Sequence, residues 1–387
     1  MDSAAGHLSE SPCPFASVAR FMSTTENTKM PERRQDSRDT TAVIREAITI
    51  KDIARLAGVS MGTVDRVLHN RGRVSTETSE RVHRIVRETR YTPNLGARRL
   101  SRSKTWTIGA VFPRSDQDGG FWIDAGAGLQ RAAEDFGGFG LRSRSFPFDR
   151  TRGSDLGRAI HEAASSGVDG ILLAPVIPEA ALEALSKLEN KLPLVLFDTP
   201  LPDAHALCFV GQDAFSAGRI GARLLSLGVS DPSRIACVVV KPSDYHIVQR
   251  VEGFTSFFAG GSAPAIFDLD IDLCDRSIES LVQQIGDCLP AIDGVYVSNA
   301  AVGDVATVLS RRGNRPLIVG HDLTASSLAS LQSGSIDFLI TQHPALQTWE
   351  AMRLFWRYFA ADFGPPKDQY LPIDVVGQEN WAYYREI

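Results

Sequence analysis

The stretch TIKDIARLAGVSMGTVDRVLHNRGRV, residues 49–74, decides how the rest of the chain is interpreted. Thr49 offers an N-cap hydroxyl, and the carboxylate of Asp52 follows three residues later, as in a capping box. Gly58 then supplies the residue that most easily ends a helix in a sharp turn. Ser60 is a favourable N-cap for a second helix. The stretch therefore predicts two short helices joined by a turn, which is a helix-turn-helix.

Apolar residues recur at helical spacing in both helices and again farther along the chain. Ser75 is placed to cap a third helix, which we expect to end near Pro93. Three such helices are enough to enclose a small core. The predicted core residues are Ile50, Ile53, Ala54, Ala57, Val59, Val64, Val67, Leu68, Val82, Ile85 and Val86.

The outer face of the second predicted helix suits the major groove of DNA. A helix fits that groove with its first turns closest to the base edges, and Arg is the side chain that most often contacts guanine there. We expect Arg66 to be the main base contact. For the two helices alone, an amphipathic hairpin with a solvated charged face is the alternative. The other candidate DNA contacts of this region are Thr49, Ser60, Met61, Gly62, Thr63, His69 and Asn70.

The charge of the chain is divided unevenly between its parts. Residues 45–104 contain fourteen Arg and Lys against six Asp and Glu, a net charge of +8. The whole chain carries −5, so the remainder carries −13. A basic head on an acidic body is expected when only one part of a protein meets phosphate. The charge distribution therefore favours a nucleic-acid partner.

Seven short motifs follow one another in the basic region, at residues 49–54, 57–60, 63–64, 66–68, 74–75, 91–94 and 97–100. Together they resemble the headpiece of the lactose-repressor (LacI/GalR) family of transcription regulators. The resemblance implies a homodimer on a near-palindromic double-stranded DNA operator, with Met61, Gly62 and Arg66 at base-contacting positions. Asp65 departs from the family pattern, which often has a small hydroxyl residue there, and its carboxylate implies an atypical operator.

A short arm after Pro93 is long enough for only one or two helical turns, so we expect it to fold only on DNA. The same resemblance implies that residues 94–101 form a hinge helix in the central minor groove. Leu100 would be the apolar wedge that kinks a base step. Asn94, Ala97 and Arg98 would be further DNA contacts of this hinge.

With 43% hydrophobic and 22% charged residues, the 387-residue chain has ordinary globular composition and length for two or three domains. Its five cysteines are odd in number and lack metal-ligand spacing, so we expect reduced thiols in a cytoplasmic protein and no metal site. No apolar run is long enough for a membrane span, and the N-terminus lacks the apolar run of a secretory signal. We expect a soluble protein that is not exported and has no membrane partner.

The chain divides into four predicted segments. Residues 1–47, rich in Ser, Thr, Pro, Glu and Arg, are expected to be a disordered extension. We assign residues 48–93 to the helix-turn-helix DNA-binding domain and residues 94–105 to the hinge helix and linker. Residues 106–387 form the ligand-binding and dimerisation domain. Because the chain ends soon after a strand predicted near residues 373–376, we expect no tetramerising helix and a dimer.

Short β-rich runs alternate with helical stretches throughout the large domain, the pattern of doubly wound parallel α/β sheets. Since roughly ten strands are too many for one modest sheet, we expect two lobes. The predicted strands include residues 107–112, 170–174, 194–197, 235–240, 294–297 and 317–320, and the predicted helices are residues 125–136, 155–166, 178–188 and 214–227.

Hydrogen-bonding side chains stand where four of these strands end. Ligands bind beyond the carboxyl ends of the strands in open α/β sheets, and Asp198, Asn299, Asp322 and Gln342 occupy such positions. Arg250 opens the helix after another strand and is expected to reach the same crevice. Carboxylates, amides and a guanidinium suit a polyhydroxylated ligand. For any one of these side chains, capping of the next helix is an equally good interpretation.

Two adjacent aromatic residues, Phe121 and Trp122, follow the first predicted strand in a loop that we expect to be exposed unless it meets a ligand. Together with residues 250–254 and the strand-end residues, the large domain resembles the periplasmic sugar-binding-protein fold, especially its ribose-binding branch, over residues 107–376. The resemblance implies that Phe121 and Trp122 sandwich a sugar ring and that Asp198, Arg250, Asn299, Asp322 and Gln342 bond its hydroxyls. Gly119 and Thr199 replace polar residues common in that branch, which leaves the identity of the sugar open.

The sequence thus predicts a DNA-binding transcription regulator, a repressor controlled by a small sugar or polyol. It would be cytoplasmic and associated with the nucleoid when bound to its operator. A sugar-binding protein of the same fold acting in uptake or sensing is one alternative, and an α/β sugar enzyme fused to a DNA-binding head is another. Motifs for nucleotide binding, zinc proteolysis and serine hydrolysis are absent from the sequence, so we expect no enzyme and no cofactor.

Overall fold

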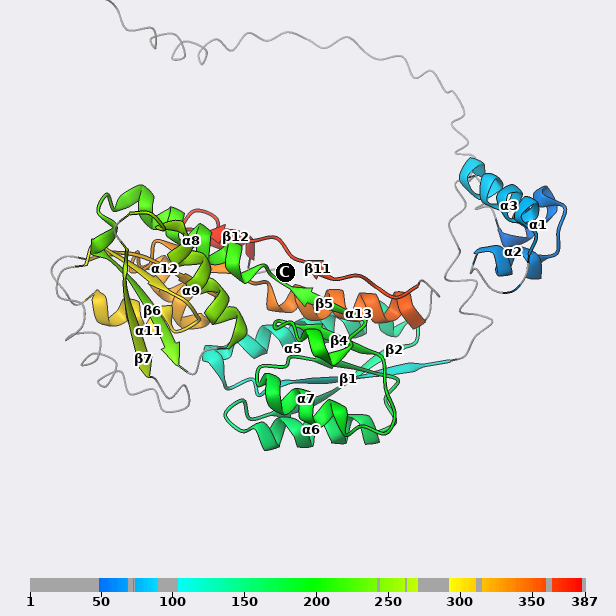
Figure 1. The fold of residues 1–387 in the computed structure, drawn as a ribbon, viewed down its shortest axis with the longest axis horizontal. Helices are drawn as coiled ribbons and strands as arrows, with labels where there is room; N and C mark the ends of the chain where they lie inside the picture. Colours follow the sequence, from blue (N-terminus) through cyan, green and yellow to red (C-terminus); the bar gives the residue numbers. More distant parts are fainter. Residues whose placement is uncertain are drawn as a thin grey trace, which may run out of the picture. The chain divides into compact units, whose positions relative to one another are not determined.

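The computed structural model describes residues 49–68, 72, 74–89, 104–241, 244–261, 263–270, 292–310, 315–359 and 364–384. They form a small helical domain and a larger two-lobed α/β domain (Figure 1). None of the helices in these ranges combines the length and the apolar character that a bilayer span requires.

The helical domain contains α1 (Ile50–Ala57), α2 (Met61–Leu68) and α3 (Thr76–Thr89), which confirms the three predicted helices. The capping box is present, because the Asp52 amide donates to Thr49 Oγ1 at 3.3 Å and the Thr49 amide donates to Asp52 Oδ2 at 3.0 Å. Gly58 ends α1 with φ +65, a left-handed conformation that favours glycine. The side chains of Ile53, Ala54, Ala57, Val64, Val67, Val82 and Ile85 are buried together, as predicted.

The first lobe is built on a six-stranded sheet in which every pair of neighbours is parallel. Helices α6 and α7 cover one face of this sheet, and α5 and α13 cover the other (Figure 1). In sheet order the strands are β11 (Gln369–Tyr370), β5 (Cys208–Gly211), β4 (Leu194–Phe197), β3 (Gly170–Leu173), β1 (Trp106–Pro113) and β2 (Leu141–Phe148). The helices are α5 (Phe121–Gly137), α6 (Gly153–Ser165), α7 (Pro178–Ser186) and α13 (Pro344–Phe359).

The second lobe repeats this arrangement with a second six-stranded sheet. In sheet order its strands are β12 (Asp374–Val376), β10 (Phe338–Thr341), β9 (Leu317–His321), β8 (Gly294–Val297), β6 (Ile235–Lys241) and β7 (Ala265–Asp270). Only β12 among the described strands runs antiparallel to its neighbour. The helices are α8 (Ala214–Gly228), α9 (Tyr245–Phe257), α11 (Val302–Leu309) and α12 (Ala325–Gln332).

The chain crosses between the lobes after β5, after β10 and between β11 and β12. Gln212, which follows β5, ties these crossings together, because its side-chain amide donates to the carbonyl oxygens of Thr341 and Pro372, each at 2.9 Å. Each lobe therefore contains segments that are distant in the sequence, and the cleft between the lobes is bordered by three crossing segments.

Four described strands, β2, β5, β7 and β11, are missing from the sequence prediction. In β2 the buried residues are Leu141 and Phe148 at the two ends, while the residues between them are exposed or half-buried. Such a strand, which pairs only with β1 and contains Pro147, lies at the edge of the sheet and lacks the continuous apolar run of a central parallel strand. Its sequence pattern is therefore weak for a physical reason.

Helices α5 and α13 pack closely because Gly128 has no side chain. A Cβ at this position would collide with the carbonyl oxygen of Ala345 and the hydroxyl of Thr348. The same hydroxyl donates to the Ala125 carbonyl oxygen at 2.8 Å, which links the two helices. The close approach therefore depends on a glycine at this position.

We predict opposite effects of two alanine substitutions in α5. Gly128→Ala should lower the free energy of unfolding by about 1–3 kcal/mol, because the helices must separate to admit the methyl group. Gly126→Ala, with no heavy atom within 4 Å of the added Cβ, should raise it by about 0.5–1 kcal/mol through helix propensity. Urea denaturation of the two variants measures both changes, and equal effects would contradict the close packing.

Candidate functional sites

The outer face of α2 carries the predicted DNA contacts that the structure describes. Met61 is 53% exposed, and Gly62 and Arg66 are exposed beside it. The Arg66 Nε donates to the Gly62 carbonyl oxygen at 3.1 Å, so the guanidinium lies along its own helix. Arg66 Nη2 also donates to Thr63 Oγ1, at 3.5 Å. A charge-assisted bond to a base or phosphate can replace these contacts.

The hydroxyl residues of the predicted interface have structural roles. Thr49 caps α1, and Ser60 Oγ accepts from the Thr63 amide at 3.1 Å at the start of α2. Helix starts also favour phosphate, so these roles are compatible with DNA contacts at the same positions. The predicted contacts His69, Asn70, Asn94, Ala97, Arg98 and Leu100 lie outside the described residues.

The second candidate site is a cavity between the two lobes of the large domain. It is lined by polar side chains that follow the carboxyl ends of strands in both sheets, where open α/β folds bind ligands. Six of the seven predicted ligand-binding residues line it: Phe121, Trp122, Asp198, Asn299, Asp322 and Gln342. The lining also includes Asp118, Arg150, Asp244, His246, Ile247, Ala300 and Ala301.

Three of the aspartates in this cavity have left-handed backbone conformations. The φ angles are +51° at Asp118, +65° at Asp198 and +71° at Asp322. Asp tolerates this region better than most residues, yet each such residue has a conformational cost, and strained residues cluster at functional sites. The Asp198 amide donates to Gln347 Oε1 at 2.9 Å, and the surroundings thereby hold its conformation. The strain supports the assignment of this cavity as a ligand site.

Arg150 is the main cavity residue that the sequence did not predict. It follows β2 and is 7% exposed at its side chain, where it forms ion pairs with Asp118 of its own lobe and Asp244 of the second lobe. Asp244 follows β6 and precedes α9. Arg150 follows an edge strand with a weak apolar pattern, so its strand-end position is not apparent from the sequence.

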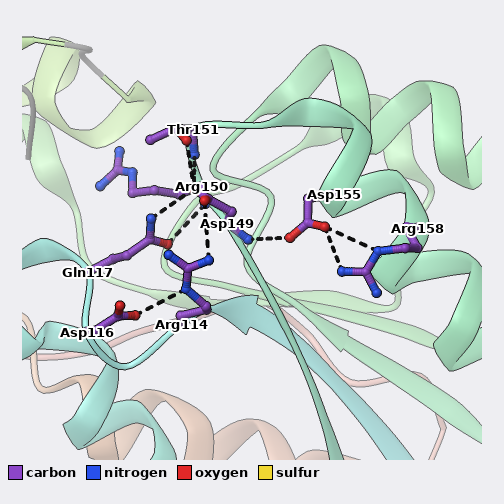
Figure 2. A network of polar contacts seen from close by, with 8 residues as sticks. All are labelled: Arg114, Asp116, Gln117, Asp149, Arg150, Thr151, Asp155 and Arg158. Atoms are coloured by element: carbon purple, nitrogen blue, oxygen red, sulfur yellow. Dashed lines mark hydrogen bonds and ion pairs between the residues drawn. The ribbon is translucent and has the colours of Figure 1, made fainter. Parts of the chain in front are cut away.

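The turn that presents Arg150 is fixed by hydrogen bonds from the loop after β1 (Figure 2). The Arg150 amide donates to Gln117 Oε1 at 3.0 Å, and Gln117 Nε2 donates to Asp149 Oδ1 at 3.0 Å. Thr151 donates to the same Asp149 oxygen through its amide and its hydroxyl, which holds the pKa of Asp149 well below its usual range. The guanidinium therefore projects from a rigid turn.

Arg250 occupies a different place from the one predicted. It lies in the second turn of α9, so the expectation that it opens the helix is wrong. Its side chain is 1% exposed and is not part of the described lining of the cavity. Nη1 donates to the Ser298 carbonyl oxygen at 2.9 Å, while Nε has no hydrogen-bond partner. Arg250 thus lies behind the cavity wall and acts on the cavity through its charge.

The predicted exposure of Phe121 and Trp122 is wrong. Both residues begin α5 and are buried, with 6% and 2% exposure, because they pack into the core of the first lobe. Their rings meet edge to face, with centroids 4.9 Å apart and planes at 86°. No sugar ring fits between two rings that touch each other, so they form one wall of the cavity instead of a sandwich. Trp122 Nε1 also donates to Asp118 Oδ2 at 2.6 Å.

Burial shifts the titration of the cavity residues. It raises the pKa of Asp198 to about 7, with a further contribution from the Asp244 carboxylate. It also raises the pKa of Asp244 to about 6, although Arg150 opposes that change. The pKa of His246 lies well below its usual value because of burial and nearby guanidinium groups, so its imidazole is neutral near pH 7. Within the described ranges, no group of His, Cys, Asp and Glu residues is arranged to hold a metal ion.

Two families of known proteins match different parts of the chain. Residues 49–94 match the bacterial regulatory proteins of the lacI family, and residues 108–362 match the periplasmic binding protein domain. The chain is 29% identical over 220 residues to the HTH-type transcriptional regulator DegA of Bacillus subtilis, covering 56% of this chain and 62% of that protein. It is 36% identical over 170 residues to the sucrose operon repressor of Klebsiella pneumoniae, covering 43% and 48% of the two chains.

These matches cover less than two thirds of the length of either relative. Among solved structures, an ABC transporter solute binding protein from Burkholderia graminis in complex with D-arabinose matches 72% of this chain and 97% of its own, with a TM-score of 0.64. The identity is 19%, so this likeness concerns the fold alone.

We predict that the two ion pairs of Arg150 are coupled. Arg150→Met should lower the free energy of unfolding by about 3–5 kcal/mol, because it leaves buried carboxylates without a cation. Adding Asp118→Asn and Asp244→Asn should recover much of that loss, since no buried charge then remains at the pair.

Arg158→Met is the matched control, because Arg158 forms two ion pairs on the surface with its side chain 51% exposed. It should lower the free energy of unfolding by less than about 1 kcal/mol. Chemical denaturation of the four proteins gives the comparison, and similar losses for Arg150→Met and Arg158→Met would contradict the buried pairing.

Proposed function

Because the chain belongs to the periplasmic binding protein domain family and carries a DNA-binding domain of the lacI family of bacterial regulators, we propose that it is a sequence-specific transcription regulator, a repressor controlled by a small sugar or polyol. The observation that carries the proposal is the presence of both sites in one chain. One is an exposed face on the second helix of a helix-turn-helix, and the other is a polar cavity between two lobes.

The DNA-binding half of the proposal rests on α2. In a helix-turn-helix the second helix enters the major groove and contacts bases with its N-terminal residues. Met61, Gly62 and Arg66 are exposed on this helix. The region from residue 45 to 104 has a net charge of +8, which favours the DNA backbone. A homodimer would place two such helices on the halves of a near-palindromic operator, and the protein would act in the cytoplasm, associated with the nucleoid.

The effector half rests on the cavity. Carboxylates and amides from both lobes face one space, and such groups match the hydroxyls of a sugar, each of which donates and accepts. A ligand bound there contacts both lobes. It changes DNA binding only if it favours one lobe arrangement over another, because coupling requires a difference in affinity between two states.

The DNA-binding domain also favours this function over its alternatives. An uptake protein of the same fold has no use for a basic helix-turn-helix. A sugar enzyme requires reactive groups beside its substrate, and the relatives with which this chain shares sequence are regulators. The proposed role is therefore regulatory and not catalytic.

We predict that Arg66 determines sequence preference. On a near-palindromic site selected from random DNA, Arg66→Ala should weaken binding by about 1–3 kcal/mol and relax the preference at one base pair of each half-site. Arg84→Ala is the control. Arg84 is exposed on α3, and its substitution removes one positive charge, as Arg66→Ala does. It should change the salt dependence and leave the preference intact. Uniform weakening of all sequences by Arg66→Ala would make Arg66 a phosphate contact.

We predict that the cavity binds the effector through Asn299. In a thermal-shift screen of pentoses, hexoses and polyols, a ligand at 100 times its dissociation constant should stabilise the protein by about 2.7 kcal/mol. Asn299→Ala should weaken binding of that ligand by about tenfold or more, through loss of hydrogen bonds. Asn190→Ala, an exposed residue outside the cavity, should leave binding unchanged. Unaltered affinity of the Asn299 variant would place the effector elsewhere.

A further inference from the structure

The cavity contains more negative than positive charge. Among the described residues, its lining contributes the carboxylates of Asp118, Asp198, Asp244 and Asp322 and one guanidinium, that of Arg150. Arg250 lies behind the wall and is the other guanidinium that influences these carboxylates. With every carboxylate ionised, the four aspartates and the two arginines have a formal net charge of −2. Arg150 is already engaged by Asp118 and Asp244.

Asp198 is the carboxylate with the least compensation. Its side chain is 1% exposed, and Oδ1 has no hydrogen-bond partner. The other oxygen, Oδ2, accepts from the Thr199 hydroxyl at 3.1 Å and lies 3.8 Å from His246 Nδ1. That imidazole is neutral, because burial lowers its pKa, and its Nδ1 also has no partner. Two unpartnered polar atoms therefore belong to neighbouring residues of one cavity.

Among the described residues, no Arg or Lys forms an ion pair with Asp198 or Asp322. Within the described part of the chain, no carboxylate lies within ion-pair distance of Arg250, whose Nη1 is bonded to a backbone carbonyl. Asp322 receives its hydrogen bonds from the neutral amide of Gln342, at 2.9 and 3.1 Å. The residue after Asp198 is Thr199, so no adjacent cation balances the charge there either.

A buried carboxylate without a cation is costly, and it either takes up a proton or binds a positive charge. Near neutral pH the Asp198 carboxyl group is divided between its protonated and ionised forms, since burial raises its pKa to about 7. Asp244, Arg250 and Asp322 are the charged groups that act on it, and His246 is its neutral neighbour. A cation supplied by the ligand would meet an acceptor that has no other partner.

We propose that the effector of this protein carries a cationic amino group, as an amino sugar or an aminated polyol does, and that the ammonium binds Asp198. This inference rests on the proposed function, because it concerns the same cavity and the same effector role. An ammonium has three donors and no acceptor, which suits Asp198 Oδ1 and the unpartnered face of His246. Phosphorylated and acidic sugars are excluded, because their charge would add to the uncompensated carboxylates.

Matched ligand pairs measured by titration calorimetry with the full chain test the proposal. The amines are 1-amino-1-deoxy pentitols and hexitols and 2-amino-2-deoxy hexoses. Their comparators are the parent polyols and sugars, the N-acetyl derivatives and the sugar phosphates. Within the sugar or polyol that binds, we expect the amine to bind at least tenfold more tightly than its parent compound. The N-acetyl derivative should lose this gain in affinity, and the phosphate should not bind.

The variant Asp198→Asn should remove the preference, so that amine and parent bind within threefold of each other. Asp203→Asn, a substitution of an exposed aspartate outside the cavity, should keep the tenfold preference. A melting temperature of Asp198→Asn at or above that of the unmodified protein at pH 8 shows that the variant is folded, because the substitution removes a buried charge.

The pH dependence gives a second readout. For an aminohexitol, whose amine stays protonated below pH ~9, affinity should rise by about tenfold from pH 6 to pH 8, because Asp198 deprotonates through a pKa of about 7. The parent hexitol should show no such rise, and Asp198→Asn should abolish it for the amine.

The outcomes separate the two proposals. If a neutral sugar binds as well as its amine and the affinity of neither rises with pH, the cationic effector is refuted and the sugar-controlled regulator stands. If neither amines nor neutral sugars bind and none alters operator binding, the proposed effector class fails as well. Retention of the amine preference by Asp198→Asn would refute the role of Asp198.

Discussion

The ion pairs of Arg150 with Asp118 and Asp244 are the contacts on which the cavity most depends, because they are shared between the two lobes. Separating the lobes removes one partner of a buried cation, and an uncompensated buried charge is strongly unfavourable until water reaches it. The pairs therefore help to hold the two lobes together. The proposed effector would bind between lobes that these ion pairs already join, and its influence on DNA binding would depend on how it changes their arrangement.

The cavity is also held in place by its backbone. Asp118, Asp198 and Asp322 occupy left-handed conformations and line the cavity. Asp198 and Asp322 directly follow β4 and β9, and Asp118 lies in the loop after β1. Such conformations persist only where the surroundings over-determine them. The hydrogen bonds from Gln342 to Asp322 and from the Asp198 amide to Gln347 supply that constraint. A site arranged in this way loses little conformational entropy when a ligand binds.

The two-lobed fold is shared with sugar-binding proteins at low identity, so the fold by itself leaves the ligand open. What distinguishes this chain is the chemistry at the strand ends. Thr199 stands beside Asp198, and Arg150 is occupied by two carboxylates. The cavity lining therefore contains more carboxylates than guanidinium groups to pair with them. The DNA-binding domain, by contrast, matches the bacterial regulatory proteins of the lacI family over residues 49–94.

The sequence by itself determined the features that depend on neighbouring residues. The capping box of Thr49 and Asp52, the turn at Gly58 and the alternation of strands and helices follow from local spacing. The strand-end positions of Asp198, Asn299, Asp322 and Gln342 were predictable for the same reason. Only the tertiary structure decided that β2 pairs at a sheet edge, that Phe121 and Trp122 are buried, and that Arg150 meets Asp244, 94 residues away. These outcomes depend on contacts between distant segments, which local patterns do not encode.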